Sequence, residues 1–188
     1  MLEDVPSLHR HLCSRTSHIF NLEIPNENGA FLNLVQHHGY PTPLLEWTYS
    51  PYVAAFFAFR REPKKIQSDD YVRIYIFDQK TWKTDWNQML SLNIAGLHFS
   101  VMEFLAIENQ RLVPQQSVTT VTNIDDIESY VKQKEIEKNC SYLTAVDIPT
   151  NERNKVMQEL SFMGITAGSM FPGLEGACEE LKERMFDE

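Results

Sequence analysis

The sequence predicts an α+β fold, with a central mixed or antiparallel sheet and flanking helices in one compact domain. Three observations predict it. A chain of 188 residues can build one hydrophobic core and leaves little room for a second. Its 43% apolar and 23% charged residues are typical of a globular domain. Helical and strand patterns follow one another without strict β-α-β alternation. We expect a single domain over residues 1–188.

Helical patterns occur along the whole chain. In residues 30–38 apolar side chains recur at helical spacing, and Gly39 can end that helix. Ser50 followed by Pro51 is typical of a helix start, so an apolar and central helix is expected over 51–59. Further helices are predicted at 7–20, 123–134 with Asn123 as cap, 150–163 with Thr150 as cap, and about 174–184.

Strand patterns lie between these helices. The segment 71–77, YVRIYIF, is rich in β-branched and aromatic residues and is the best strand. Shorter strands are predicted at 104–107, 118–122 and 142–148. Pro114 predicts an edge, bulge or turn before Gln115. Residues 60–70 are interpreted as a charged loop that includes the basic run Arg60, Arg61, Lys64 and Lys65. Residues 81–99 have no clear assignment.

Charge and cysteine content exclude several classes of protein. The net charge of −9 argues against a broad nucleic-acid surface, because phosphate contact needs clustered Lys and Arg. Cys13, Cys140 and Cys178 are odd in number and far apart, which fits neither a disulfide framework nor a CxxC zinc site. No apolar stretch approaches the roughly 20 residues of a membrane span. We expect a cytoplasmic protein without a membrane segment or a metal site.

The segment 36–59, QHHGYPTPLLEWTYSPYVAAFFAF, is richer in special residues than core packing requires. Gly39 can take positive φ, while Pro41 and Pro43 fix φ and favour extended predecessors. A stiff loop is therefore expected over residues 38–44. Such a loop ahead of a buried helix suits a ligand site, since the free N–H groups of the helix attract anions.

Several side chains in this segment could brace the loop or bind a ligand. Glu46 must turn outward or find a donor such as His37 or Thr42. His37 and His38 point about 100° apart on a helix, so they form a poor metal pair. His37 is instead expected to hydrogen-bond Glu46 or a loop carbonyl. Thr42 lies between the two prolines of the stiff loop.

Other candidates follow in the chain. Trp47 could belong to the core or stack on a planar ligand. Thr48 and Ser50 suit helix capping, with or without a further role. Gln115 and Gln116 could hydrogen-bond a polar ligand or could simply be surface residues; an amide does not titrate, so neither can act as a general base.

The segment resembles the signature of the FRG domain family, a QHYGxPTRLLDWTxSPxxAxxFA-type motif. The matching residues are Gln36, His37, Gly39, Pro41, Thr42, Leu44, Leu45, Trp47, Thr48, Ser50, Pro51, Ala54, Phe57 and Ala58. Arg111 and Gln115 match the family's RxxxQxG-type segment, and the tail MGITAGSMFPGLEGACEEL resembles its closing segment. The likeness runs from about residue 7 to the C-terminus.

Three departures from the family pattern are present. The aromatic-Arg-Gly tripeptide that names the family is absent, Pro43 stands where members have arginine, and Glu46 stands where they have aspartate. We expect either a shortened form of the domain or the loss of its first strand.

The order of the family's motifs is similar to the layout with which ADP-ribosyltransferases hold NAD. The resemblance therefore implies an ADP-ribosyltransferase-like fold in which Thr48 and Ser50 lie on a hydroxyl-bearing element and Gln115 takes a late polar position. NAD would be a substrate rather than a resident cofactor. Gln115 and Glu46 are the catalytic candidates. The ligand-binding candidates are His37, Thr42, Trp47, Thr48, Ser50, Arg111 and Gln116.

Two alternatives stay open. Domains of this resemblance occur in bacteria, some of them in suspected phage-defence or toxin systems, which implies a non-catalytic module that senses a small-molecule or nucleotide ligand or binds a protein partner. A metal-dependent hydrolase using His37, His38 and Glu46 is the third hypothesis.

Overall fold

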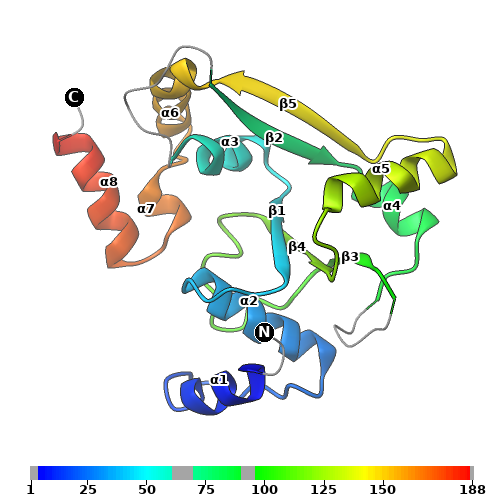
Figure 1. Ribbon diagram of the computed structural model, residues 1–188. Coiled ribbons are helices and arrows are strands. Elements are labelled where there is room, and N and C mark those ends of the chain that lie inside the picture. The colour runs from blue at the N-terminus through cyan, green and yellow to red at the C-terminus, as the bar shows by residue number, and fades with distance from the viewer. Residues whose placement is uncertain (1–3, 61–69, 90–95, 187–188) are drawn as a thin grey trace.

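The computed structural model describes residues 4–60, 70–89 and 96–186. Two antiparallel sheets with flanking helices form its framework (Figure 1), which confirms the α+β class. The first sheet has the order β1-β4-β3 and the second pairs β2 with β5. The strand bounds are β1 Leu44–Thr48, β2 Tyr71–Phe77, β3 Phe99–Met102, β4 Ser117–Thr122 and β5 Leu143–Pro149. Arg61, Lys64 and Lys65 of the predicted basic run lie outside the described residues.

Most of the helices expected from the sequence are present, together with additional short helices. Their bounds are α1 Val5–Leu12, α2 Pro25–His37, α3 Pro51–Arg60, α4 Gln79–Asp85, α5 Ile127–Lys138, α6 Arg153–Phe162, α7 Ala167–Met170 and α8 Leu174–Phe186, with a 3-10 turn at Thr150–Glu152. The patterns of α4 and α7 were too short to predict. No helix in the three described ranges has both the length and the apolar character that crossing a bilayer requires.

Two predicted elements were wrong in detail. The strand expected at 104–107 lies earlier, at Phe99–Met102, where all four residues are buried against β4. Asn123 does not cap a helix: its side chain accepts from the backbone N–H of His98, and α5 begins later, with Asp126 accepting from Ser129 N. In both cases a contact with a distant segment overrode the local pattern.

Thr150 is likewise not a side-chain cap. Its hydroxyl donates to the carbonyl of Asp70 at 2.9 Å, which ties the end of β5 to the start of β2. The 3-10 turn that begins at Thr150 then leads into α6.

The stiff loop ends one residue earlier than predicted, because Leu44 is already the first residue of β1. Leu44–Thr48 pairs with β4 in the register Leu44 to Val121 and Thr48 to Ser117. Gly39 has φ +87° directly after α2, in agreement with the expected positive φ. The loop between them carries Pro41 and Pro43, and the strand it leads to is an edge strand of the first sheet.

Helix α3 follows β1 and contacts strands of both sheets, β1 and β2. Its start is capped as predicted: Ser50 Oγ accepts from Val53 N at 3.3 Å, and Thr48 Oγ1 accepts from Ser50 N at 3.1 Å. The helix is not buried all round, because Phe57 keeps 39% of its surface exposed. Its open side faces the candidate site.

Replacing Gly39 by valine is expected to lower the free energy of unfolding by roughly 1–3 kcal/mol, because a β-branched residue is strained at positive φ. A Cβ at this position would meet no atom within 4 Å, so backbone strain alone causes the loss. Urea denaturation measures it. Gly96→Val is the matched control, since Gly96 also has open space around it but no positive φ. Equal stability of the two variants would contradict the prediction.

Glu135 joins α5 to the start of β5. It is only 7% exposed, and its Oε1 accepts from the backbone N–H groups of Tyr142 at 2.8 Å and Leu143 at 3.0 Å. Burial alone raises the pKa of this carboxyl, but these two hydrogen bonds and Lys132 outweigh burial and lower it. The carboxylate therefore stabilises the fold above its ordinary pKa, and this contribution is lost as the pH falls through the lowered value.

Glu135→Ala is expected to cost about 3 kcal/mol of unfolding free energy at neutral pH, because two buried N–H groups lose their acceptor. Chemical denaturation measures the loss, with the exposed Glu137→Ala as control. The difference from the wild type should shrink in acid. A loss that is the same at pH 7 and pH 3 would contradict the assigned role of the charge.

Candidate functional site

A cleft of about 410 Å³ lies along β1, with α3, β2 and the start of β4 as its other walls. This volume lies within the range of about 300–1,000 Å³ that is usual for small-molecule sites. Residues from four separate segments line it, among them Glu46, Trp47, Thr48, Phe57, Arg73 and Gln115. The cleft is mostly apolar, with one carboxylate and one guanidinium among its walls.

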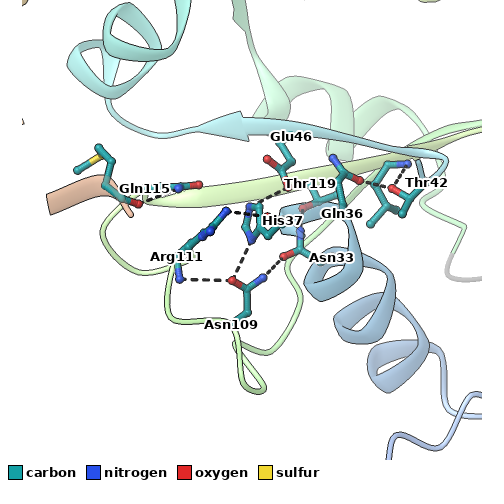
Figure 2. Close-up of polar contacts among 11 residues, drawn as sticks. Asn33, Gln36, His37, Thr42, Glu46, Asn109, Arg111, Gln115 and Thr119 are labelled. Atoms are coloured by element: carbon teal, nitrogen blue, oxygen red, sulfur yellow. Dashed lines mark hydrogen bonds and ion pairs between the residues drawn. The ribbon is translucent and has the colours of Figure 1, made fainter. Parts of the chain in front are cut away.

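Glu46 is held against His37 at the end of α2 (Figure 2). Oε1 of Glu46 lies 2.9 Å from Nε2 of His37, and the two side chains are 30% and 7% exposed. Both atoms are buried, and neither has a partner that meets full hydrogen-bond geometry. The contact is thus a close electrostatic pair, in which His37 is buried and Glu46 reaches the cleft.

A chain of amides supports His37 from behind. Its Nδ1 lies 2.8 Å from Oδ1 of Asn109, whose Nδ2 donates to Oδ1 of Asn33 at 2.7 Å. Asn33 in turn donates to Thr119 Oγ1 on β4 at 3.3 Å. Asn33 and Asn109 are 0% and 4% exposed, so the chain is fully inside the protein. It fixes the position of the imidazole relative to both α2 and β4.

Arg111, in the turn before β4, contacts the end of α2 next to this chain of amides. Its Nη1 donates to the carbonyl of His37 at 2.6 Å, and its Nη2 donates to Glu175 of α8 at 3.0 Å. The guanidinium also lies 5.2 Å from the centre of the Phe171 ring. Arg111 therefore braces the end of α2 rather than lining the cleft.

Opposing effects act on the pKa of His37. Burial lowers it, whereas the contact with Glu46, the charge of Glu46 and the Asn109 hydrogen bond raise it, and the net result is a raised pKa. A protonated His37 thus stabilises the folded state fully below the pKa of an unfolded histidine. This contribution is lost as the pH rises through the raised value.

Gln115 and Thr48 connect β1 to the C-terminal part of the chain. Thr48 Oγ1 donates to the carbonyl of Gln115 at 2.7 Å. The amide Nε2 of Gln115 donates to the carbonyl of Met170, the last residue of α7, at 2.9 Å. Gln115 is only 5% exposed. It borders the cleft mainly as a link between β4 and α7.

The predicted site residues divide into two groups. Glu46, Trp47, Thr48 and Gln115 line the cleft. The indole of Trp47 donates to Thr120 Oγ1 at 3.0 Å and packs 5.3 Å from the ring of Phe77, so one part of this side chain belongs to the core.

The other predicted residues do not line the cleft: His37, Thr42, Ser50, Arg111 and Gln116. Thr42 bonds Gln36 and the N–H of Leu44, and so holds the loop. Gln116 takes φ +49° in the turn, and its carbonyl accepts from Tyr49 N. Their role as ligand contacts stays a prediction.

Sequence reasoning missed the wall formed by β2. Arg73 and Tyr75 line the cleft opposite β1. Arg73 is held by Asp147 of β5 through Nε at 2.6 Å and Nη2 at 2.7 Å. The signal was present in YVRIYIF, because residues two apart in a strand share a face. It also missed Asn33 and Asn109, for which no local pattern exists.

Across the described ranges, no group of three or more His, Cys, Asp or Glu side chains is arranged to hold a metal ion. His38, which the metal hypothesis required, is exposed.

Comparison with known proteins gives one match. No curated protein and no solved structure matches the chain. The family model described as FRG domain matches residues 5–67, a stretch that contains α1, α2, β1 and α3. The cleft residues Glu46, Trp47, Thr48 and Phe57 lie within it, whereas Arg73 and Gln115 lie beyond it. The resemblance to the FRG domain family is thus confirmed for residues 5–67 of this chain.

Proposed function

We propose that the cleft binds NAD and that the protein cleaves the bond between nicotinamide and ribose, as an ADP-ribosyltransferase or NAD glycohydrolase would. One observation carries the proposal: Glu46 and Thr48 of the FRG segment and Gln115 of a distant segment line one cleft. The motif order that resembles transferases thus coincides with a common pocket.

The chemistry of the walls suits this reaction. When the C–N bond breaks, its electron pair moves to the nicotinamide nitrogen and positive charge develops on the ribose. A carboxylate such as Glu46, next to this carbon, would stabilise that charge. Water then adds to the ribose carbon and loses a proton, or an acceptor nucleophile takes the place of water.

Binding would use the remaining walls. Trp47 and Phe57 offer aromatic surface for a planar ring. Arg73 is a planar donor suited to the pyrophosphate and lies on the opposite wall from β1. Gln115 holds β4 and α7 together and cannot act as a base, so we assign it a positioning role.

The test is incubation of the purified protein with NAD, followed by chromatographic measurement of released nicotinamide. Release above the rate without protein is the expected result. The protein-free reaction and heat-denatured protein are the controls. Absence of release at high protein concentration, from correctly folded protein, would overturn the enzyme proposal.

One observation favours the alternative of a ligand sensor. The bonds from Thr48 to Gln115 and from Gln115 to Met170 connect a wall of the cleft to the end of α7. A ligand that shifts β1 would therefore act on the C-terminal helices. Thermal stabilisation by NAD without nicotinamide release would support this function.

A further inference from the structure

The buried amide chain specifies which nitrogen of His37 carries a proton. Oδ1 of Asn109 receives the backbone N–H of Arg111 at 3.3 Å. A backbone N–H can only donate, so the Asn109 atom that faces it is the carbonyl oxygen. The same oxygen lies 2.8 Å from Nδ1 of His37. Two acceptors cannot form this contact, and Nδ1 must therefore carry a hydrogen.

This assignment has a consequence on the other side of the ring. In a neutral imidazole only one nitrogen is protonated, so Nε2 would then present a lone pair. Nε2 lies 2.9 Å from Oε1 of Glu46, and both atoms are shielded from solvent. A lone pair facing a carboxylate at this distance is repulsive. The contact becomes attractive when Nε2 also carries a proton and the ring is positively charged.

We propose that His37 is a doubly protonated imidazolium that pairs with the carboxylate of Glu46 at the wall of the cleft, and that His37 is the positioning residue that keeps Glu46 in place. The extra proton resides on Nε2 of His37, so Glu46 stays a carboxylate and its other oxygen is left for a ligand. When the proton is lost, the ring is neutral, the lone pair of Nε2 repels the carboxylate oxygen, and Glu46 leaves its position. This inference adds regulation by pH to the proposed function. The ion pair itself does not depend on that function; only its effect on turnover rests on the proposed function.

The charges around the ring are consistent with such a pair. Glu46 of β1 faces Nε2, and Arg111 faces the carbonyl of His37 from the turn before β4. The charge of Arg111 opposes protonation of His37, but Glu175 of α8 partly balances it. Because the two groups interact, the midpoint at which the ring loses its proton depends on both residues.

The test is a pH titration of nitrogen-labelled histidine followed by NMR, without any ligand. The His37 signals are identified by their loss in His37→Gln. We expect Nδ1 to remain protonated above the midpoint, and the midpoint to lie above that of a free histidine. In Glu46→Gln the midpoint should fall by about one pH unit or more, because the opposite charge is gone. Glu159→Gln, an exposed carboxylate elsewhere, is the control.

Two results would overturn the proposal: protonation of Nε2 instead of Nδ1 in the neutral ring, or a midpoint that Glu46→Gln does not move. The first is read from the unaltered protein and does not depend on the folding of a variant. If nicotinamide is released, the pH profile of kcat/KM should fall above the same midpoint and become flat in His37→Gln. The expected titration without any release would uphold the ion pair of His37 with Glu46 and reject the proposed function.

Discussion

Glu46→Gln is expected to lower kcat for nicotinamide release by at least about 100-fold, because an amide cannot balance the positive charge that develops on the ribose. Glutamine has nearly the same shape and can still offer its side-chain oxygen to His37. The fold should therefore survive, which melting temperature and circular dichroism would verify. The rate is measured by nicotinamide release at saturating NAD.

The matched control is Glu159→Gln, which removes the same charge from an exposed position on α6. It should keep the wild-type rate. A similar rate in Glu46→Gln and in this control would show that Glu46 has no catalytic role. A rise in KM with unchanged kcat would instead assign Glu46 to substrate binding.

Gly176→Ala is expected to destabilise the C-terminal region by about 3 kcal/mol, since the site is already full. A Cβ at Gly176 would lie 2.1 Å from the carbonyl oxygen of Phe171 and 2.6 Å from that of Ala167. These are backbone atoms, so rotation of a side chain cannot relieve the contact. The start of α8 would have to move away from α7.

The displacement would also loosen the ion pairs that α8 makes with the rest of the protein, Glu175 with Arg111 and Glu179 with Arg60. A drop in melting temperature of roughly 6–12 °C is expected for a loss of this size. Gly96→Ala, where the added Cβ meets open space, is the control. An unchanged melting temperature of Gly176→Ala would show that the two helices are free to separate.

The elements that sequence reasoning located correctly are those with strong local signals. The YVRIYIF strand, the Ser50–Pro51 helix start and the positive φ of Gly39 each depend on a few neighbouring residues. The misplaced cap at Asn123 and the misplaced strand at 104–107 depend on pairing partners far along the chain. Local propensity could not supply those partners.

The same distinction between local signals and distant contacts applies to the candidate site. The motif between residues 36 and 59 identified Glu46, Trp47 and Thr48 as candidates. The contact of His37 with Glu46 agrees with the expectation that this carboxylate finds a partner such as His37. The strand pattern placed Arg73 and Tyr75 on one face of β2, but the tertiary structure was needed to show that they border the cleft. The amide chain through Asn33 and Asn109 had no sequence signal.

By itself, the sequence determined the α+β class, the stiff turn after α2, the capped start of α3 and the likeness of residues 5–67 to the FRG domain. The tertiary structure alone decided that these parts meet Arg73 and Gln115 at one cleft, and that His37 has Asn109 behind it. His37 and Asn109 are 72 positions apart, and Asn33 and Thr119 are 86. Backbone preferences act over a few residues, whereas the protonation of a buried group depends on whichever atoms the completed fold brings to it.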